Sequence, residues 1–178
     1  MRSCRLLMVA FTVVFAIVLY AQDAAPNLSD GIKQGYNNIK NNFTKAADVM
    51  PDDGYAFAPT KEERTFGGWV AHIADAQMAI CSRANGAQKS LNAGSMTKKS
   101  DLTAALKQSF DECDRAYSAL TDANAKDAVQ SFRGTTSRLA ALAGNVSHDN
   151  EAYGSMAVYL RLKGIVPPST AGRGGRHN

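Results

Sequence analysis

The segment DLTAALKQSFDECDRAYSAL, residues 101–120, carries the most regular apolar pattern in the chain. Its apolar side chains recur at the three- and four-residue spacing that places them along one side of an α-helix. They are Leu102, Leu106, Phe110, Cys113, Tyr117 and Leu120. Asp101 stands at the start and is a residue type that caps helix N-termini. The segment therefore predicts an amphipathic helix that must bury one face against other elements.

Three more segments on either side show the same spacing. Residues 28–50 begin with Ser29 or Asp30 as candidate caps, residues 65–84 begin with Thr65, and residues 135–163 end at Gly164. Their apolar positions are Ile32, Tyr36, Ile39 and Phe43, then Phe66, Trp69, Ile73, Ala76 and Ile80, then Leu139, Leu142, Val146, Tyr153, Met156 and Leu160. No convincing strand is found, and residues 121–134 are expected to be a connection. The pattern predicts an all-α four-helix bundle.

The connections between the second and third and between the third and fourth predicted helices are long. Short loops would force each helix to run antiparallel to the one before it, whereas long ones also permit a crossover that leaves two successive helices parallel. The sequence pattern leaves both arrangements open.

The N-terminus has the pattern of a secretory signal peptide. Arg2 and Arg5 precede an uncharged, mostly apolar run at residues 6–19, and residue 21 is a small alanine. We therefore expect a signal peptide at residues 1–21, a linker at 22–27, the bundle at 28–168 and a flexible tail at 169–178. The mature protein is then periplasmic or secreted, with no membrane contact after cleavage. The alternative is an uncleaved membrane anchor.

Composition and charge exclude several classes of protein. The 178 residues fit one domain, and 45% hydrophobic with 20% charged residues excludes bulk disorder and a multi-span membrane protein. The net charge of +4 comes from arginines in the leader and tail, which contain no acidic residue. The remaining chain is electrically balanced and predicts no binding to nucleic acid.

Export changes the interpretation of the cysteines, because disulfides persist in oxidising compartments. Cys4 would leave with the leader, so Cys81 and Cys113 would remain. In an antiparallel hairpin these two residues would be separated by roughly 14 Å along the helix axis, which is too far for a bond. In a parallel arrangement they would lie toward the same end of the bundle. A Cys81–Cys113 disulfide is thus a hypothesis that depends on helix direction.

Three stretches resemble the DinB-like family of metal-dependent four-helix-bundle proteins: FGGWVAHIADAQ at 66–77, SHDNEAYG at 147–154 and YLRLKGIVPP at 159–168. The resemblance covers about residues 28–169. It implies a bundle with a crossover between helices two and three. It also implies a divalent-metal site of three histidines, matched here by His72 and His148. Some relatives are thiol-dependent transferases, which implies that kind of chemistry as a possibility here.

The third histidine of the family falls on Ala152, which has no donor atom, and His177 in the tail matches no family position. Asp149, Glu151 or Asp75 could replace it with an oxygen ligand. Asp149 could instead orient a ligand, or could simply be a hydrogen-bonded or surface carboxylate. From periodicity alone His72 lies at the edge of the buried face and His148 is exposed, so only the resemblance turns His148 inward.

Two kinds of function remain open. One is a protein that binds a divalent metal such as zinc or nickel through an incomplete triad, as a remnant of a thiol-dependent transferase or hydrolase. The other is a non-catalytic periplasmic bundle that binds a small molecule or a partner, or serves only as a structural protein. A homodimer is possible in either case. The aromatic residues Trp69, Tyr117 and Tyr153 are expected to belong to the core.

Overall fold

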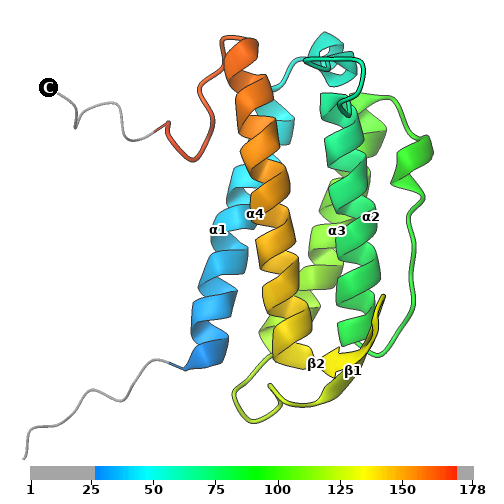
Figure 1. Ribbon diagram of the computed structural model, residues 1–178, viewed down its shortest axis with the longest axis vertical. Coiled ribbons are helices and arrows are strands. Elements are labelled where there is room, and N and C mark those ends of the chain that lie inside the picture. Colours follow the sequence, from blue (N-terminus) through cyan, green and yellow to red (C-terminus); the bar gives the residue numbers. More distant parts are fainter. Residues whose placement is uncertain (1–26, 172–178) are drawn as a thin grey trace, which may run out of the picture.

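The computed structural model describes residues 27–171, which form four long helices and a short hairpin (Figure 1). The sequence order is α1 (Leu28–Val49), the 3-10 helix η1 (Asp52–Ala56), α2 (Phe66–Ala84), the 3-10 helix η2 (Ala93–Ser95), α3 (Lys99–Ala119), β1 (Ala128–Ser131), β2 (Gly134–Ser137) and α4 (Arg138–Leu162). The predicted leader, Cys4 and His177 lie outside the described residues. Within residues 27–171, no helix is both long and apolar enough to cross a bilayer.

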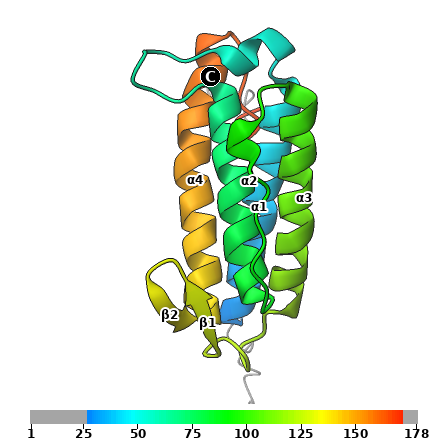
Figure 2. The ribbon, with the colours of Figure 1, turned by 90° about the vertical axis from the view of Figure 1, so that its right-hand side faces the viewer.

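Helices α2 and α3 run parallel, so the crossover is present. Gly67, in the first turn of α2, lies against Leu102, in the first turn of α3. Cys81 and Cys113 meet toward the C-terminal ends of the same two helices. The segment between Asn85 and Lys98 therefore returns along the length of the bundle (Figure 2). Asp75 of α2 holds this segment by accepting the backbone N–H groups of Ala93 and Gly94, at 2.9 and 3.0 Å.

The parallel direction brings Cys81 and Cys113 into a disulfide, with their Cα atoms 4.9 Å apart. Both cysteines are completely buried. Of the two arrangements that the sequence left open, the structure has the one that allows the bond, because the long return segment carries the chain back before α3 begins.

The helix starts depend on specific caps. Thr65 accepts the N–H of Gly68 at the start of α2, as expected, and Ser137 accepts the N–H of Ala140 at the start of α4. Helix α1 differs from the prediction of a cap at Ser29 or Asp30. The backbone N–H groups of Leu28 and Ser29, at its start, donate hydrogen bonds to the carboxylate of Asp122, which is distant in sequence. Helix α3 begins at Lys99, which places Asp101 inside its first turn.

The expectation that the chain has no strand was wrong. Strands β1 and β2 pair antiparallel, with Val129 opposite Thr136 and Ser131 opposite Gly134. Gly134 has φ of 104°, a left-handed value that glycine adopts without strain. Each strand has only four residues, too few to produce a clear alternation of apolar and polar side chains. The hairpin displaces the start of α4 from the predicted residue 135 to Arg138.

The core lies along the bundle axis and contains most of the predicted apolar positions. Tyr36 of α1 stacks on Tyr117 of α3, with ring centroids 3.9 Å apart. Tyr117 and Tyr153 are buried as expected, while Trp69 is only partly buried at the rim of the core. Beyond the predicted boundary at residue 168, Ser169 still contacts the bundle by donating its N–H to the hydroxyl of Tyr153.

Candidate metal centre

The imidazoles of His72 and His148 face each other across α2 and α4. Their Nε2 atoms are 3.0 Å apart and their ring centroids 5.0 Å apart. The expectation from periodicity that His148 is exposed was wrong, because its side chain is 34% exposed and turned toward α2. Helix α4 packs against both α1 and α2. Its buried surface is therefore wider than the single apolar stripe that a periodicity argument detects.

Asp149 lies behind His148 in the interior of the bundle. Its side chain is completely buried, and Oδ1 is 3.5 Å from His148 Nδ1. Asn145 donates to Oδ2 of Asp149 at 3.2 Å and also to the hydroxyl of Tyr117, which itself donates to the carbonyl of Leu142. Asp149 is thus a hydrogen-bonded carboxylate beside the ring of His148, and it does not lie on the helix surface.

The two histidines have opposite electrostatic environments. Burial lowers the pKa of His72, and the charges of Arg64 and His148 act in the same direction. The neighbouring Asp149 carboxylate raises the pKa of His148 against the effect of burial. Burial raises the pKa of Asp149 itself. A carboxylate next to Nδ1 favours a proton on that nitrogen, which leaves the lone pair of His148 on Nε2, facing His72.

Several buried polar atoms of α2 and α4 lack a hydrogen-bond partner. They include Trp69 Nε1, Gln77 Oε1 and Nε2, Asn145 Oδ1, His148 Nδ1 and Asp149 Oδ1. Buried polar atoms are nearly always paired in folded proteins, so a group of exceptions marks places where water or an ion completes the structure. Here the exceptions include Nδ1 of His148 and Oδ1 of Asp149, which lie 3.5 Å apart.

The two Nε2 atoms are spaced so that they could occupy two coordination positions of one divalent cation. Two nitrogen ligands at about 2.0–2.1 Å from one zinc ion lie roughly 2.8–3.4 Å apart at ligand angles of about 90–110°. The 3.0 Å between the Nε2 atoms falls at the short end of that interval, and it is also the length of a hydrogen bond between the two rings. A carboxylate behind a ligating histidine is also the usual supporting arrangement at metal sites. In the described part of the chain, no group of three or more His, Cys, Asp and Glu side chains is placed to hold a metal.

The candidates for a third ligand can now be compared. Ala152, at the family's histidine position, is 2% exposed and provides no donor. Asp75 has both oxygens engaged by the return segment, and Glu151 is exposed on α4. Asp149 remains beside Nδ1 of His148, on the side of the ring away from Nε2. Its position suits a residue that orients His148.

A cleft of about 630 Å³ opens next to His72, between the first half of α2, η1 and the return segment. Its lining is both polar and apolar: Asp52, Tyr55, Ala56, Arg64, Thr65, Gly67, Gly68, Ala71, His72, Asp75, Gly94, Met96, Thr97 and Leu102. The volume is that of a site for a small molecule. His72 therefore connects the histidine pair to a space that a ligand can enter, which the sequence pattern did not reveal.

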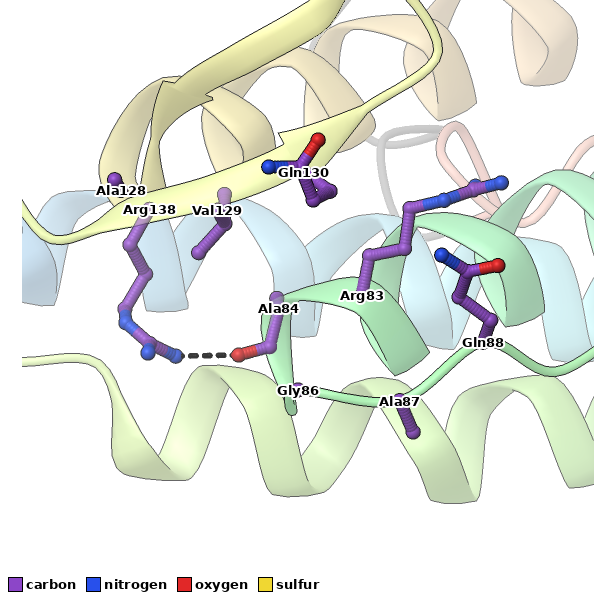
Figure 3. A pocket seen from close by; sticks show the side chains of 9 residues that line it. All are labelled: Arg83, Ala84, Gly86, Ala87, Gln88, Ala128, Val129, Gln130 and Arg138. Carbon is purple, nitrogen blue, oxygen red and sulfur yellow. Dashed lines mark hydrogen bonds between the residues drawn. The ribbon is translucent and has the colours of Figure 1, made fainter.

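A second cavity of about 320 Å³ lies at the opposite end of α2, under the hairpin (Figure 3). Arg138 crosses it and donates to the carbonyl of Ala84, the last residue of α2. The guanidinium of Arg83 lies 4.3 Å from the ring centroid of Phe132. Both arginines thus serve to close this end of the bundle, and neither histidine lines the cavity.

The sequence signature of the DinB superfamily matches residues 37–156 of this chain. The chain belongs to the DinB superfamily. Its structure is similar to that of a DinB-like protein from Bacillus cereus, with a TM-score of 0.67 and 20% sequence identity over 78% of this chain and 95% of the other. A DinB-like protein from Bacillus subtilis has a TM-score of 0.61 and 18% identity over 75% of this chain and 92% of the other. No curated protein matches the sequence significantly.

Proposed function

We propose that this DinB-superfamily protein binds a divalent metal ion, zinc or nickel, through Nε2 of His72 and Nε2 of His148. The observation that carries the proposal is the 3.0 Å separation of these two nitrogens at the convergence of α2 and α4. The carboxylate of Asp149 behind His148 supports it. A cation held in this way supplies open coordination positions that polarise a bound ligand.

The chain's own residues suit a site with two protein ligands. Asp149 holds the orientation of His148, and Asn145 in turn holds Asp149. Ala152 leaves the third position without a protein donor, which lowers the affinity relative to a complete triad. We infer that the protein is a remnant of a thiol-dependent transferase or hydrolase of this family.

A second candidate function is the binding of a small molecule without catalysis. The cleft of about 630 Å³ beside His72 supports it, because this space is large enough for a ligand whether or not a metal is present.

We also propose that the protein is exported. The signal-peptide pattern at residues 1–21 is one argument. The buried Cys81–Cys113 disulfide is a second, because such bonds persist in oxidising compartments such as the periplasm.

The metal proposal is tested by elemental analysis of the purified mature protein and by calorimetric titration with zinc and nickel. His72→Ala and His148→Ala should each lower zinc affinity at least about tenfold, because each removes a ligand. Ala152→His should raise it by at least about tenfold, because it restores a donor one helical turn from His148.

His177→Ala is the matched control, since it removes a histidine that corresponds to no family ligand, and it should leave the affinity unchanged. The metal proposal fails if wild-type protein binds neither ion, or if the three alanine variants lose the same affinity.

A further inference from the structure

Arg64 lines the cleft beside His72, and its positively charged side chain forms no ion pair with an acidic side chain of the described residues. Among residues 27–171, no carboxylate oxygen lies within 4.0 Å of its guanidinium. The guanidinium carbon is 4.9 Å from the ring centroid of Trp69, which is one turn before His72. Stacking on an indole limits the motion of an exposed arginine and leaves the outer edge of its donor group available.

Neither of the two acidic residues that line the same cleft contacts Arg64. Asp75 has both carboxylate oxygens hydrogen-bonded to backbone N–H groups of the return segment. Asp52 lies 3.8 Å from Lys99 Nζ, and its side chain is 89% exposed to solvent. Arg64 is therefore the one cationic side chain of the lining and has no direct ion-pair partner, although Asp52 and Asp75 contribute negative charge to the same cleft.

Much of the remaining lining is apolar. Ala56, Ala71, Met96 and Leu102 contribute side chains from η1, α2, the return segment and α3. A ligand that uses this lining buries a hydrocarbon part, while its charged group remains near Arg64. An inorganic anion would use only the charge.

We propose that the cleft binds a small organic acid, whose anionic group pairs with Arg64 and whose apolar part lies against Ala71, Met96 and Leu102. This inference rests on the second candidate function, the binding of a ligand in the cleft, and it needs no metal ion.

The chain contains its own reporter, because Trp69 is its only tryptophan and lies directly against Arg64. Metal-free mature protein is titrated with hexanoate at low ionic strength, with Trp69 fluorescence and calorimetry as readouts. Hexanamide, an uncharged analogue of similar shape, and inorganic phosphate are titrated in parallel. Metal is removed by dialysis without a chelator, since common chelators are themselves polycarboxylates.

Hexanoate should bind about tenfold more tightly than hexanamide, as expected for a charge-assisted hydrogen bond to a guanidinium. Arg64→Gln should remove this difference while leaving hexanamide binding unchanged. Arg64→Lys, which retains the charge but not the planar donor group, should retain part of it. Lys61→Gln is the matched control, because Lys61 carries the same charge three residues earlier and does not line the cleft. It should bind hexanoate as the wild type does.

Four results would overturn the inference: equal binding of hexanoate and hexanamide, no effect of Arg64→Gln, an equal loss in Lys61→Gln, or binding of phosphate without hexanoate. Absence of binding by any probe up to about 10 mM, a Kd typical of only weak contacts, also counts against it. The zinc titration of the wild type is a separate measurement, so failure of the metal site and failure of the anion site are distinguishable.

Discussion

His148 and Asp149 are neighbours in the chain but face different parts of the molecule. Successive side chains on an α-helix point about 100° apart. His148 therefore reaches α2, while Asp149 is directed into the bundle, where Asn145 donates to it. A completely buried carboxylate is costly unless it is paired or protonated. Asp149 Oδ1 lies 3.5 Å from Nδ1 of His148, and the proposed role of this carboxylate is to orient the ring.

Asp149→Asn should lower zinc affinity about 10–100-fold, the usual effect of losing a partner behind a metal-binding histidine. Titration calorimetry measures the affinity, and a thermal melt of the same sample checks that the variant is folded. Glu151→Gln is the control, because it removes an exposed acidic charge two residues further along α4. If both variants bind zinc as the wild type does, Asp149 does not orient a ligand.

At the scale of the elements, the helix starts combine local and distant contacts. The hydroxyls of Thr65 and Ser137 cap α2 and α4 from the residue just before each helix. The start of α1 instead depends on Asp122, more than 90 residues away in sequence. A local capping pattern is visible in a sequence, whereas a carboxylate supplied by a distant connection is not.

Thr65→Ala and Ser137→Ala should each lower the free energy of unfolding by about 1 kcal/mol, because each leaves a first-turn N–H group without its side-chain acceptor. The two effects should add in the double variant, since the caps lie at opposite ends of the bundle. Urea denaturation measures the change. Ser100→Ala removes a hydroxyl of α3 that bonds only to the neighbouring Asp101 and should have little effect. Equal losses in all three variants would contradict a capping role.

At the scale of the whole molecule, the parallel pair α2 and α3 is held at both ends. Gly67 and Leu102 meet at one end, and the Cys81–Cys113 disulfide joins the helices near the other. Close to the disulfide, the nearly buried Glu112 of α3 accepts hydrogen bonds from Asn85 and Lys89 and pairs with Arg115. These contacts attach the start of the return segment to α3.

Replacing both cysteines, Cys81→Ala with Cys113→Ala, should lower the free energy of unfolding by about 4 kcal/mol, because the bond spans 32 residues of sequence and restricts the unfolded chain. Urea denaturation of the variant and of the wild type, each with and without reductant, measures the effect. Reductant should weaken only the wild type. Two free thiols in the unreduced mature protein, detected by mass spectrometry, would contradict the bond.

Acid should weaken the fold through Glu112. Burial acts to raise its pKa, but the hydrogen bonds from Lys89 and Asn85 and the charge of Arg115 outweigh burial and hold the pKa below its usual value. A carboxyl group with a lower pKa in the folded state stabilises the protein above the pKa of the unfolded chain, near about 4.3. That contribution is lost as the pH falls through the folded-state pKa.

Glu112→Gln should therefore cost about 1–3 kcal/mol at pH 7 and clearly less near pH 3, where the wild-type carboxyl is losing its charge as well. Urea denaturation at both pH values measures the difference. Asp111→Asn removes an exposed partner of Lys107 and should have a small effect at each pH. A cost of Glu112→Gln that does not change with pH would show that packing, and not charge, explains it.

Local periodicity was sufficient to predict the four helices and the cap at Thr65, because those features depend on residues within one or two turns. The resemblance to the DinB-like family added the pairing of His72 with His148 and the crossover. The hairpin and the Asp122 contact were not predicted, and periodicity alone placed His148 at the surface, because each of these features depends on partners far away in sequence. The same reason applies to the disulfide: the spacing of Cys81 and Cys113 allowed two outcomes, and only the parallel packing of α2 and α3 selects one.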